Sequence, residues 1–152
     1  MPLPRVVNVK HLGIRPGEPL PPGHIYIGHR NQGWGLKRSR WANPYVRRWM
    51  SPAERVATLP DYETFLRRRP DKLERLPDLA TATAIACWCA GPEGLDVHAP
   101  LVCHGQIMLR LLLEKHPNTA GSQVLPATAR VAPRRAPLRE APVRACAAQD
   151  LR

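Results

Sequence analysis

The fold is decided by the stretch Ala82-Thr83-Ala84-Ile85-Ala86-Cys87-Trp88-Cys89. Its residues are mostly small, apolar or β-branched, and the run is short enough for a buried strand of a parallel sheet. Side chains two residues apart on a strand point the same way, so Cys87 and Cys89 face together and Trp88 faces the opposite side. The stretch therefore predicts a central strand that ends in two neighbouring thiols.

Other elements are indicated on both sides of this run. Residues 6–9 and 24–28 are short β runs, the second ended by glycine. Residues 51–54 have the form of a helix capping box with proline at the first helical position. Residues 104–115 place their apolar side chains on one helical face. We expect an α/β fold: a small single domain with a short, mostly parallel sheet flanked by helices, including one over residues 106–115 that packs on the sheet.

Length and charge narrow the possibilities further. A chain of 152 residues supports one domain, which we assign to residues 1–118. Residues 119–152 are rich in Ala, Pro and Arg without any period and predict a disordered basic tail. The net charge is +11, and residues 1–50 hold nine Lys or Arg side chains against one acidic side chain. Such an excess attracts polyanions, either nucleic acid or phosphate-bearing small molecules.

Apolar runs and cysteines indicate the compartment. No apolar run approaches the ~20 residues that span a bilayer, and the first residues lack the apolar segment of a signal peptide. Four cysteines in a chain of this length do not make a disulfide scaffold. We therefore expect a cytoplasmic protein without membrane contact, whose thiols are free for metal binding or chemistry.

A second stretch, Cys103-His104-Gly105, places a thiol and an imidazole at the start of the predicted helix. A helix N-terminus favours thiolate over thiol. Three interpretations follow. Cys87, Cys89, Cys103 and His104 form a Cys3His metal site, with zinc as the favoured ion; or Cys103 is a nucleophilic or redox thiol; or the cysteines are small apolar side chains packed in a buried strand.

Between the second β run and the first helix lies a basic loop with interleaved aromatic residues. This composition suits contacts with phosphates and stacking on bases; it equally suits a loop held in place by its own aromatic side chains. We expect the loop to supply a cationic rim to the site, from Arg30, Lys37, Arg38 and Arg40.

Several motifs occur in one order: Arg5-Val6-Val7-Asn8-Val9, Ile25-Tyr26-Ile27-Gly28, Ser39-Arg40-Trp41-Ala42-Asn43-Pro44-Tyr45, and Ala86-Cys87-Trp88-Cys89-Ala90 followed by Cys103-His104-Gly105. This order, over about residues 5–115, resembles an uncharacterised family of phages and actinobacteria, domain of unknown function 4326. The resemblance implies a small α/β domain whose motif residues gather at one site. The chain departs from the family pattern at Ala42, where Gly is usual, at Gln106, which replaces an acidic residue, and in a longer loop between Cys89 and Cys103.

Together these features predict a phage- or mobile-element-type accessory protein that acts on or binds a nucleotide or nucleic acid through its Cys/His site. In this interpretation Cys103 is the reactive or ligating thiol, and Asn43 and His104 orient the substrate. The alternative is a non-enzymatic Cys3His zinc-binding module that contacts nucleic acid. The predicted ligand-binding positions are Asn8, Gly28, Arg30, Lys37, Arg38, Ser39, Arg40 and Trp41.

Overall fold

The computed structural model describes residues 3–119. Three parallel strands, β1 (Arg5–Asn8), β2 (His24–Tyr26) and β3 (Ala84–Cys87), form one sheet in the order β1-β3-β2. The predicted α/β fold with a short parallel sheet is thereby confirmed. The predicted tail, residues 119–152, lies outside the described residues except for its first residue.

The central position of β3 follows from its composition. All four of its residues are buried, as expected for a strand paired on both edges and covered on both faces. Ile85 is in register with Val6 of β1 and Ile25 of β2, so three β-branched side chains lie in one row across the sheet. Because the strands are parallel, their carboxyl ends meet at one edge, where α/β proteins commonly bind ligands.

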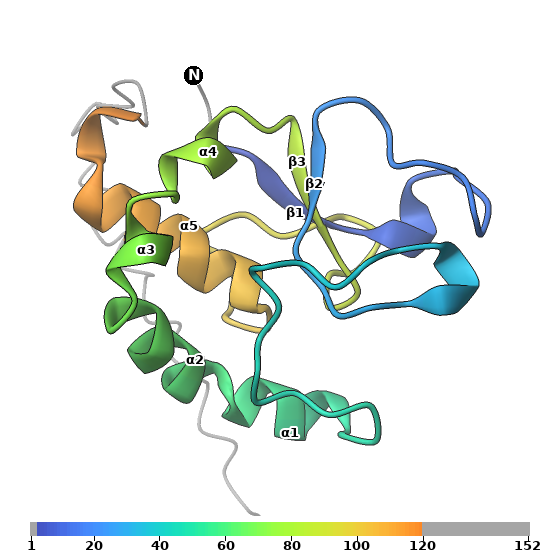
Figure 1. The fold of residues 1–152 in the computed structure, drawn as a ribbon, viewed down its shortest axis with the longest axis horizontal. Helices are drawn as coiled ribbons and strands as arrows, with labels where there is room; N and C mark the ends of the chain where they lie inside the picture. Colours follow the sequence, from blue (N-terminus) through green and yellow to red (C-terminus); the bar gives the residue numbers. More distant parts are fainter. Residues whose placement is uncertain (1–2, 120–152) are drawn as a thin grey trace, which may run out of the picture.

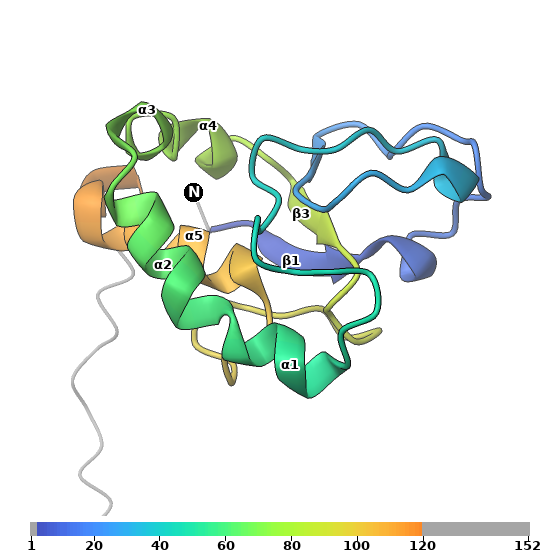
Figure 2. The same ribbon diagram turned by 60° about the horizontal axis from the view of Figure 1, so that its bottom comes forward.

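Helices connect β2 to β3 and follow β3. The Ser51 hydroxyl accepts a hydrogen bond from the Glu54 N–H, and the Glu54 carboxylate accepts one from the Ser51 N–H, so the capping box starts a helix as predicted. Figures 1 and 2 show the helices α2 to α5 gathered at one end of the molecule and the long loops after β1 and β2 at the other. The helices are α1 (Pro52–Ala57), α2 (Leu59–Arg67), α3 (Pro70–Leu73), α4 (Pro77–Ala80) and α5 (His104–Lys115), with short 3-10 turns η1 (Val9–His11), η2 (Gln32–Trp34) and η3 (Pro117–Thr119).

The start of α5 packs directly on the sheet. A Cβ atom at Gly105 would lie only 2.9 Å from side-chain carbons of Val6 and Ile27, so only glycine permits this approach. Farther along, the buried face of α5 packs against α2 and α3. This packing fixes the N-terminus of α5 beside the carboxyl end of β3, which is where the two cysteine stretches meet.

Candidate metal centre and arginine-lined pocket

Three cysteines and one histidine lie together where β3 ends and α5 begins. Their sulfur and nitrogen atoms all lie within 4.8 Å of one another. The sulfurs of Cys87 and Cys89 are 3.5 Å apart, and Nδ1 of His104 lies 3.9 Å from the Cys87 sulfur and 4.0 Å from the Cys103 sulfur. We call these four residues the Cys3His cluster. A group of this composition could hold a metal ion.

The separations suit tetrahedral zinc. Zinc–sulfur bonds of ~2.3 Å and zinc–nitrogen bonds of ~2.0 Å place neighbouring ligand atoms about 3.5–3.8 Å apart. The three separations given above lie within a few tenths of an ångström of that range, and the remaining pairs need a modest side-chain movement to reach it. Four protein donors would complete the coordination shell, which is the pattern of structural zinc sites rather than of catalytic sites with an open position.

The imidazole of His104 presents its unprotonated nitrogen to the sulfurs. Nε2 lies 2.9 Å from the carbonyl oxygen of Ile27, and a carbonyl oxygen can only accept a hydrogen bond, so the proton of the neutral ring is assigned to Nε2. Nδ1 then carries the lone pair. The ring of Tyr62 packs edge-on against the imidazole, with 5.4 Å between centroids. Contacts of this outer kind orient metal-binding histidines.

The thiols of the cluster share their protons unequally. Hydrogen bonds from the Cys103 and Cys89 thiols hold the pKa of Cys87 well below its usual range. The interaction with Cys87 and Cys89, together with burial, raises the pKa of Cys103. Cys103 is fully buried, whereas Cys89 is exposed. The cluster thus stabilises a thiolate at Cys87, and thiolate is the form in which cysteine binds zinc.

The start of α5 positions two residues of the cluster, Cys103 and His104. Cys103 is the N-cap of α5, and its sulfur accepts a hydrogen bond from the Gly105 N–H at 3.4 Å. The side-chain oxygen of Gln106 reaches back and accepts from the backbone N–H groups of Val102 and Cys103, at 2.9 and 3.1 Å. This reciprocal capping fixes Cys103 and its neighbour His104 at the first turn.

A hydrogen-bonding side chain of the sheet positions the segment of the other two cluster residues, Cys87 and Cys89. Asn8, at the end of β1, donates through Nδ2 to the carbonyl oxygens of Trp88 and Ala90, at 3.2 and 2.7 Å. These two bonds tie the segment that carries Cys89 to the neighbouring strand. Asn8 therefore acts as a positioning residue for the Cys-Trp-Cys segment.

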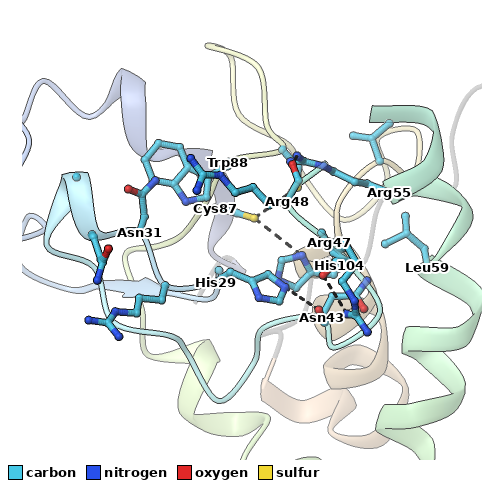
Figure 3. A pocket seen from close by; sticks show the side chains of 17 residues that line it. His29, Asn31, Asn43, Arg47, Arg48, Arg55, Leu59, Cys87, Trp88 and His104 are labelled. Carbon is cyan, nitrogen blue, oxygen red and sulfur yellow. Dashed lines mark hydrogen bonds between the residues drawn. The ribbon is translucent and has the colours of Figure 1, made fainter. Parts of the chain in front are cut away.

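A pocket of about 770 Å³ opens over the cluster, and Cys87, Cys89 and His104 form part of its wall (Figure 3). None of the described residues that line it is acidic, and none of the salt bridges found within residues 3–119 involves its arginines. Positive charge without a carboxylate partner favours an anionic ligand, phosphate above all. The arginines of the pocket are Arg30, Arg47, Arg48 and Arg55.

One wall of the pocket is a rigidly held indole. Trp88 donates from Nε1 to the hydroxyl oxygen of Tyr26 at 2.7 Å, and that hydroxyl donates to the carbonyl of His29. Burial raises the pKa of Tyr26 to about 12, so the hydroxyl stays protonated at neutral pH. A Cβ atom at Gly28 would lie 2.5 Å from the same hydroxyl, so glycine is required there. Trp34 packs edge-on against Trp88.

Asn43 lines the pocket but its amide is engaged in the loop. Nδ2 donates to Thr58 Oγ1 at 2.9 Å, and Oδ1 accepts from the Tyr45 N–H at 3.0 Å. The main-chain carbonyl oxygen of Asn43 lies 2.7 Å from Nε2 of His29, and His29 also lines the pocket. Burial lowers the pKa of His29, which favours the neutral ring. Because the Asn43 oxygen can only accept a hydrogen bond, the proton of that ring is assigned to Nε2. The contacts of Asn43 hold the loop, and its substrate-orienting role stays a prediction.

The predicted site residues fall into two groups. The four metal-ligand candidates come together, and Gly28, Arg30 and Asn43 line the pocket. The remaining ligand-binding positions do not line it, and their ligand contacts stay predictions. In the structure Trp41 is buried and the Ser39 hydroxyl accepts from its N–H. The positions away from the pocket wall are Asn8, Lys37, Arg38, Ser39, Arg40 and Trp41.

Sequence reasoning missed four cationic or titratable groups of the pocket: His29, Arg47, Arg48 and Arg55. Arg47 and Arg48 lie two and three residues after the segment 39–45 that carries the family motif, and this proximity is a signal that could have identified them. Arg55 lies in α1, and only the folded loop brings it to the pocket. Its guanidinium donates to the carbonyl oxygens of Met50 and Arg48, at 3.0 and 3.4 Å.

Comparison with known protein families identifies the same family that the order of the motifs resembles. A family model described as "Domain of unknown function (DUF4326)" matches residues 10–114, which include the pocket and the cluster. An uncharacterised protein of Acanthamoeba polyphaga mimivirus is 31% identical over 96 residues, which are 60% of this chain and 70% of that protein. No solved structure matches the chain. No helix within residues 3–119 has the length and apolar character needed to cross a bilayer.

Proposed function

The chain belongs to the family of domain of unknown function DUF4326, and within that family we propose that it is a zinc-stabilised binding module for a nucleotide or nucleic acid. The observation that carries the proposal is the pocket itself: its arginines form no salt bridge within residues 3–119, and three residues of the Cys3His cluster form part of its wall. The origin of the mimivirus relative is in line with a phage- or mobile-element-type accessory role.

Zinc has a structural role in this proposal. The cluster offers four protein donors, which leaves the ion no open position for a substrate. Zinc would join the carboxyl end of β3 to the N-terminus of α5, and both ends contribute residues to the pocket wall. Thiolate ligands persist where cysteines stay reduced, so we place the protein in the cytoplasm.

The ligand class follows from the charges. Guanidinium groups bind phosphate oxygens in pairs of parallel hydrogen bonds, and they do so most strongly where no carboxylate competes. Asn31 and Gln32 add amide groups to the same wall, and Trp88 adds a ring. A nucleotide presents a phosphate group and a flat base with hydrogen-bonding edges, so the pocket is chemically matched to one.

The metal is tested on the full chain purified without a tag. Elemental analysis should give about one zinc per chain, and absorbance spectroscopy of the cobalt-substituted protein should show the bands of tetrahedral thiolate coordination. A metal-free protein with one unusually reactive thiol would contradict the zinc module. It would favour instead the interpretation in which Cys103 or a neighbouring thiol carries out chemistry.

The ligand is tested by calorimetric titration with thymidine 5′-monophosphate and with inorganic phosphate. Arg48→Ala should weaken binding of both, because the Arg48 guanidinium lines the pocket and makes no side-chain hydrogen bond within residues 3–119. Arg68→Ala is the matched control: it removes an exposed arginine at the end of α2, away from the pocket. Equal binding by the two variants would contradict an arginine-lined phosphate site.

A further inference from the structure

A large aromatic side chain stands exposed next to the arginines of the pocket. Trp49 is 81% exposed, and Tyr45, in the same loop, is 40% exposed. A single exposed aromatic residue is common on protein surfaces and carries little by itself. Here, however, Trp49 directly follows Arg47 and Arg48, both of which line the pocket. Two exposed aromatic side chains, Tyr45 and Trp49, therefore flank two arginines of the pocket.

The backbone around Trp49 is held in an ordered turn. The Met50 N–H donates to the carbonyl of Arg47 at 3.2 Å. The guanidinium of Arg55 then donates to the carbonyls of Arg48 and Met50, the residues on either side of Trp49. An indole presented on a fixed backbone loses little conformational entropy when a ring stacks on it, which favours binding.

From these observations, and resting on the proposed function of the pocket, we propose that the ligand is a single-stranded nucleic acid that runs from the pocket across the loop segment 45–49. One nucleotide occupies the pocket beside Trp88, and an adjacent base stacks on Trp49. The phosphate between them lies against Arg47 and Arg48. Aromatic rings interleaved with cationic side chains are the usual means of binding single strands without sequence preference.

A single strand fits this arrangement better than a duplex or a free nucleotide. Stacking on an indole requires a base with an open face, and in a duplex both faces are covered by neighbouring base pairs. A free nucleotide fills the pocket but leaves Trp49 without a partner. Trp88 lines the pocket and Trp49 does not, so the two rings are assigned to two different nucleotides.

The test compares two probes on the full chain. Fluorescence anisotropy measures binding of a labelled oligothymidine of about twelve nucleotides, within the usual site sizes of such proteins, and calorimetry measures binding of thymidine 5′-monophosphate. Trp49→Ala should weaken oligonucleotide binding by about tenfold, the effect of removing one stacked base. The same variant should bind the mononucleotide as the wild type does, and Trp49→Phe should restore most of the oligonucleotide affinity.

The outcomes separate this inference from the proposed function. If Trp49→Ala leaves oligonucleotide binding unchanged, or if a duplex of the same length binds as tightly as the single strand, the inference is wrong while a nucleotide pocket still stands. If neither probe binds, or if Arg48→Ala affects neither, the proposed function fails as well. Zinc content and melting temperature of Trp49→Ala should match the wild type, because the side chain is exposed.

Discussion

Among the four residues of the Cys3His cluster, Cys89 is the one at the surface, and this makes it the best single residue with which to test the proposed metal. Replacement of an exposed side chain ordinarily changes stability by no more than about 0.5 kcal/mol. Cys89→Ser should nevertheless lower the zinc content below one per chain and reduce the melting temperature, because a hydroxyl is a poor zinc ligand. Elemental analysis and calorimetry measure the two effects. The matched control is chelation: wild type and Cys89→Ser should melt together once zinc is removed, and a persistent difference would contradict the metal role.

Gln106 links the start of α5 to the loop between Cys89 and Cys103. Its buried amide nitrogen lies 3.0 to 3.2 Å from the carbonyl oxygens of Asp96, Ala99 and Pro100, all in the long loop between Cys89 and Cys103. An acidic side chain could not donate to these groups when ionised. The amide group of Gln106 thus holds this loop against the start of α5.

Gln106→Glu should therefore destabilise this chain by about 2 kcal/mol at neutral pH, because it leaves buried carbonyl groups without a donor. Burial beside those oxygens raises the pKa of the new carboxyl, so the loss should shrink as the pH is lowered and the group keeps its proton in the folded state. Urea unfolding at neutral and acidic pH measures both. A loss that is the same at both pH values would contradict this account.

At the scale of the elements, α2 and α5 are joined by an exposed ion pair that sets a pH dependence. Arg67 of α2 bonds to Glu114 of α5 at 2.6 and 2.8 Å and also to Glu63. The hydrogen bond to Arg67 lowers the pKa of Glu114 from 4.5 to about 2. A carboxyl whose folded pKa is lowered contributes stability above its unfolded pKa and loses it as the pH falls through the folded value.

Glu114→Gln should consequently flatten the decline in stability between about pH 4.5 and pH 2, the window set by those two values. Urea unfolding at a series of acidic pH values measures how steeply the free energy of unfolding declines with pH. Glu74→Gln is the control, since Glu74 is exposed and forms no salt bridge within residues 3–119. The same flattening in the control would show that the effect comes from net charge rather than from the α2–α5 contact.

The elements also show what could be predicted from sequence. The capping box at Ser51 and the apolar face of α5 are local patterns, and both helices begin where these patterns indicate. The strand residues were found from short β-branched runs. The placement of Arg55 could not be found this way, because its position depends on the path of the loop between β2 and α1. The sequence predicts a cationic rim from Arg30, Lys37, Arg38 and Arg40. Of these only Arg30 lines the pocket, and the other arginines of its wall are Arg47, Arg48 and Arg55.

At the scale of the whole molecule, the cluster joins the sheet to the helical end. Removal of zinc should lower the melting temperature of the full chain, because metal binding in such sites is coupled to folding. Protons compete with zinc for the three thiolates and for Nδ1 of His104, so the stabilisation should be largest at neutral pH and should disappear as the pH falls. Calorimetry with and without a chelator, at a series of pH values, measures this. Melting temperatures that are unaffected by the chelator at neutral pH would contradict a structural zinc.

The order β1-β3-β2 has a consequence for biosynthesis. The two outer strands are made first, yet they do not pair with each other. Within the sheet each pairs with β3, which is translated some sixty to eighty residues later. Until that segment leaves the ribosome, both outer strands remain unpaired and open to association with other chains. The nascent protein therefore has to stay soluble before its sheet can form, and the excess of positive charge in residues 1–50, whose like charges repel, is suited to that.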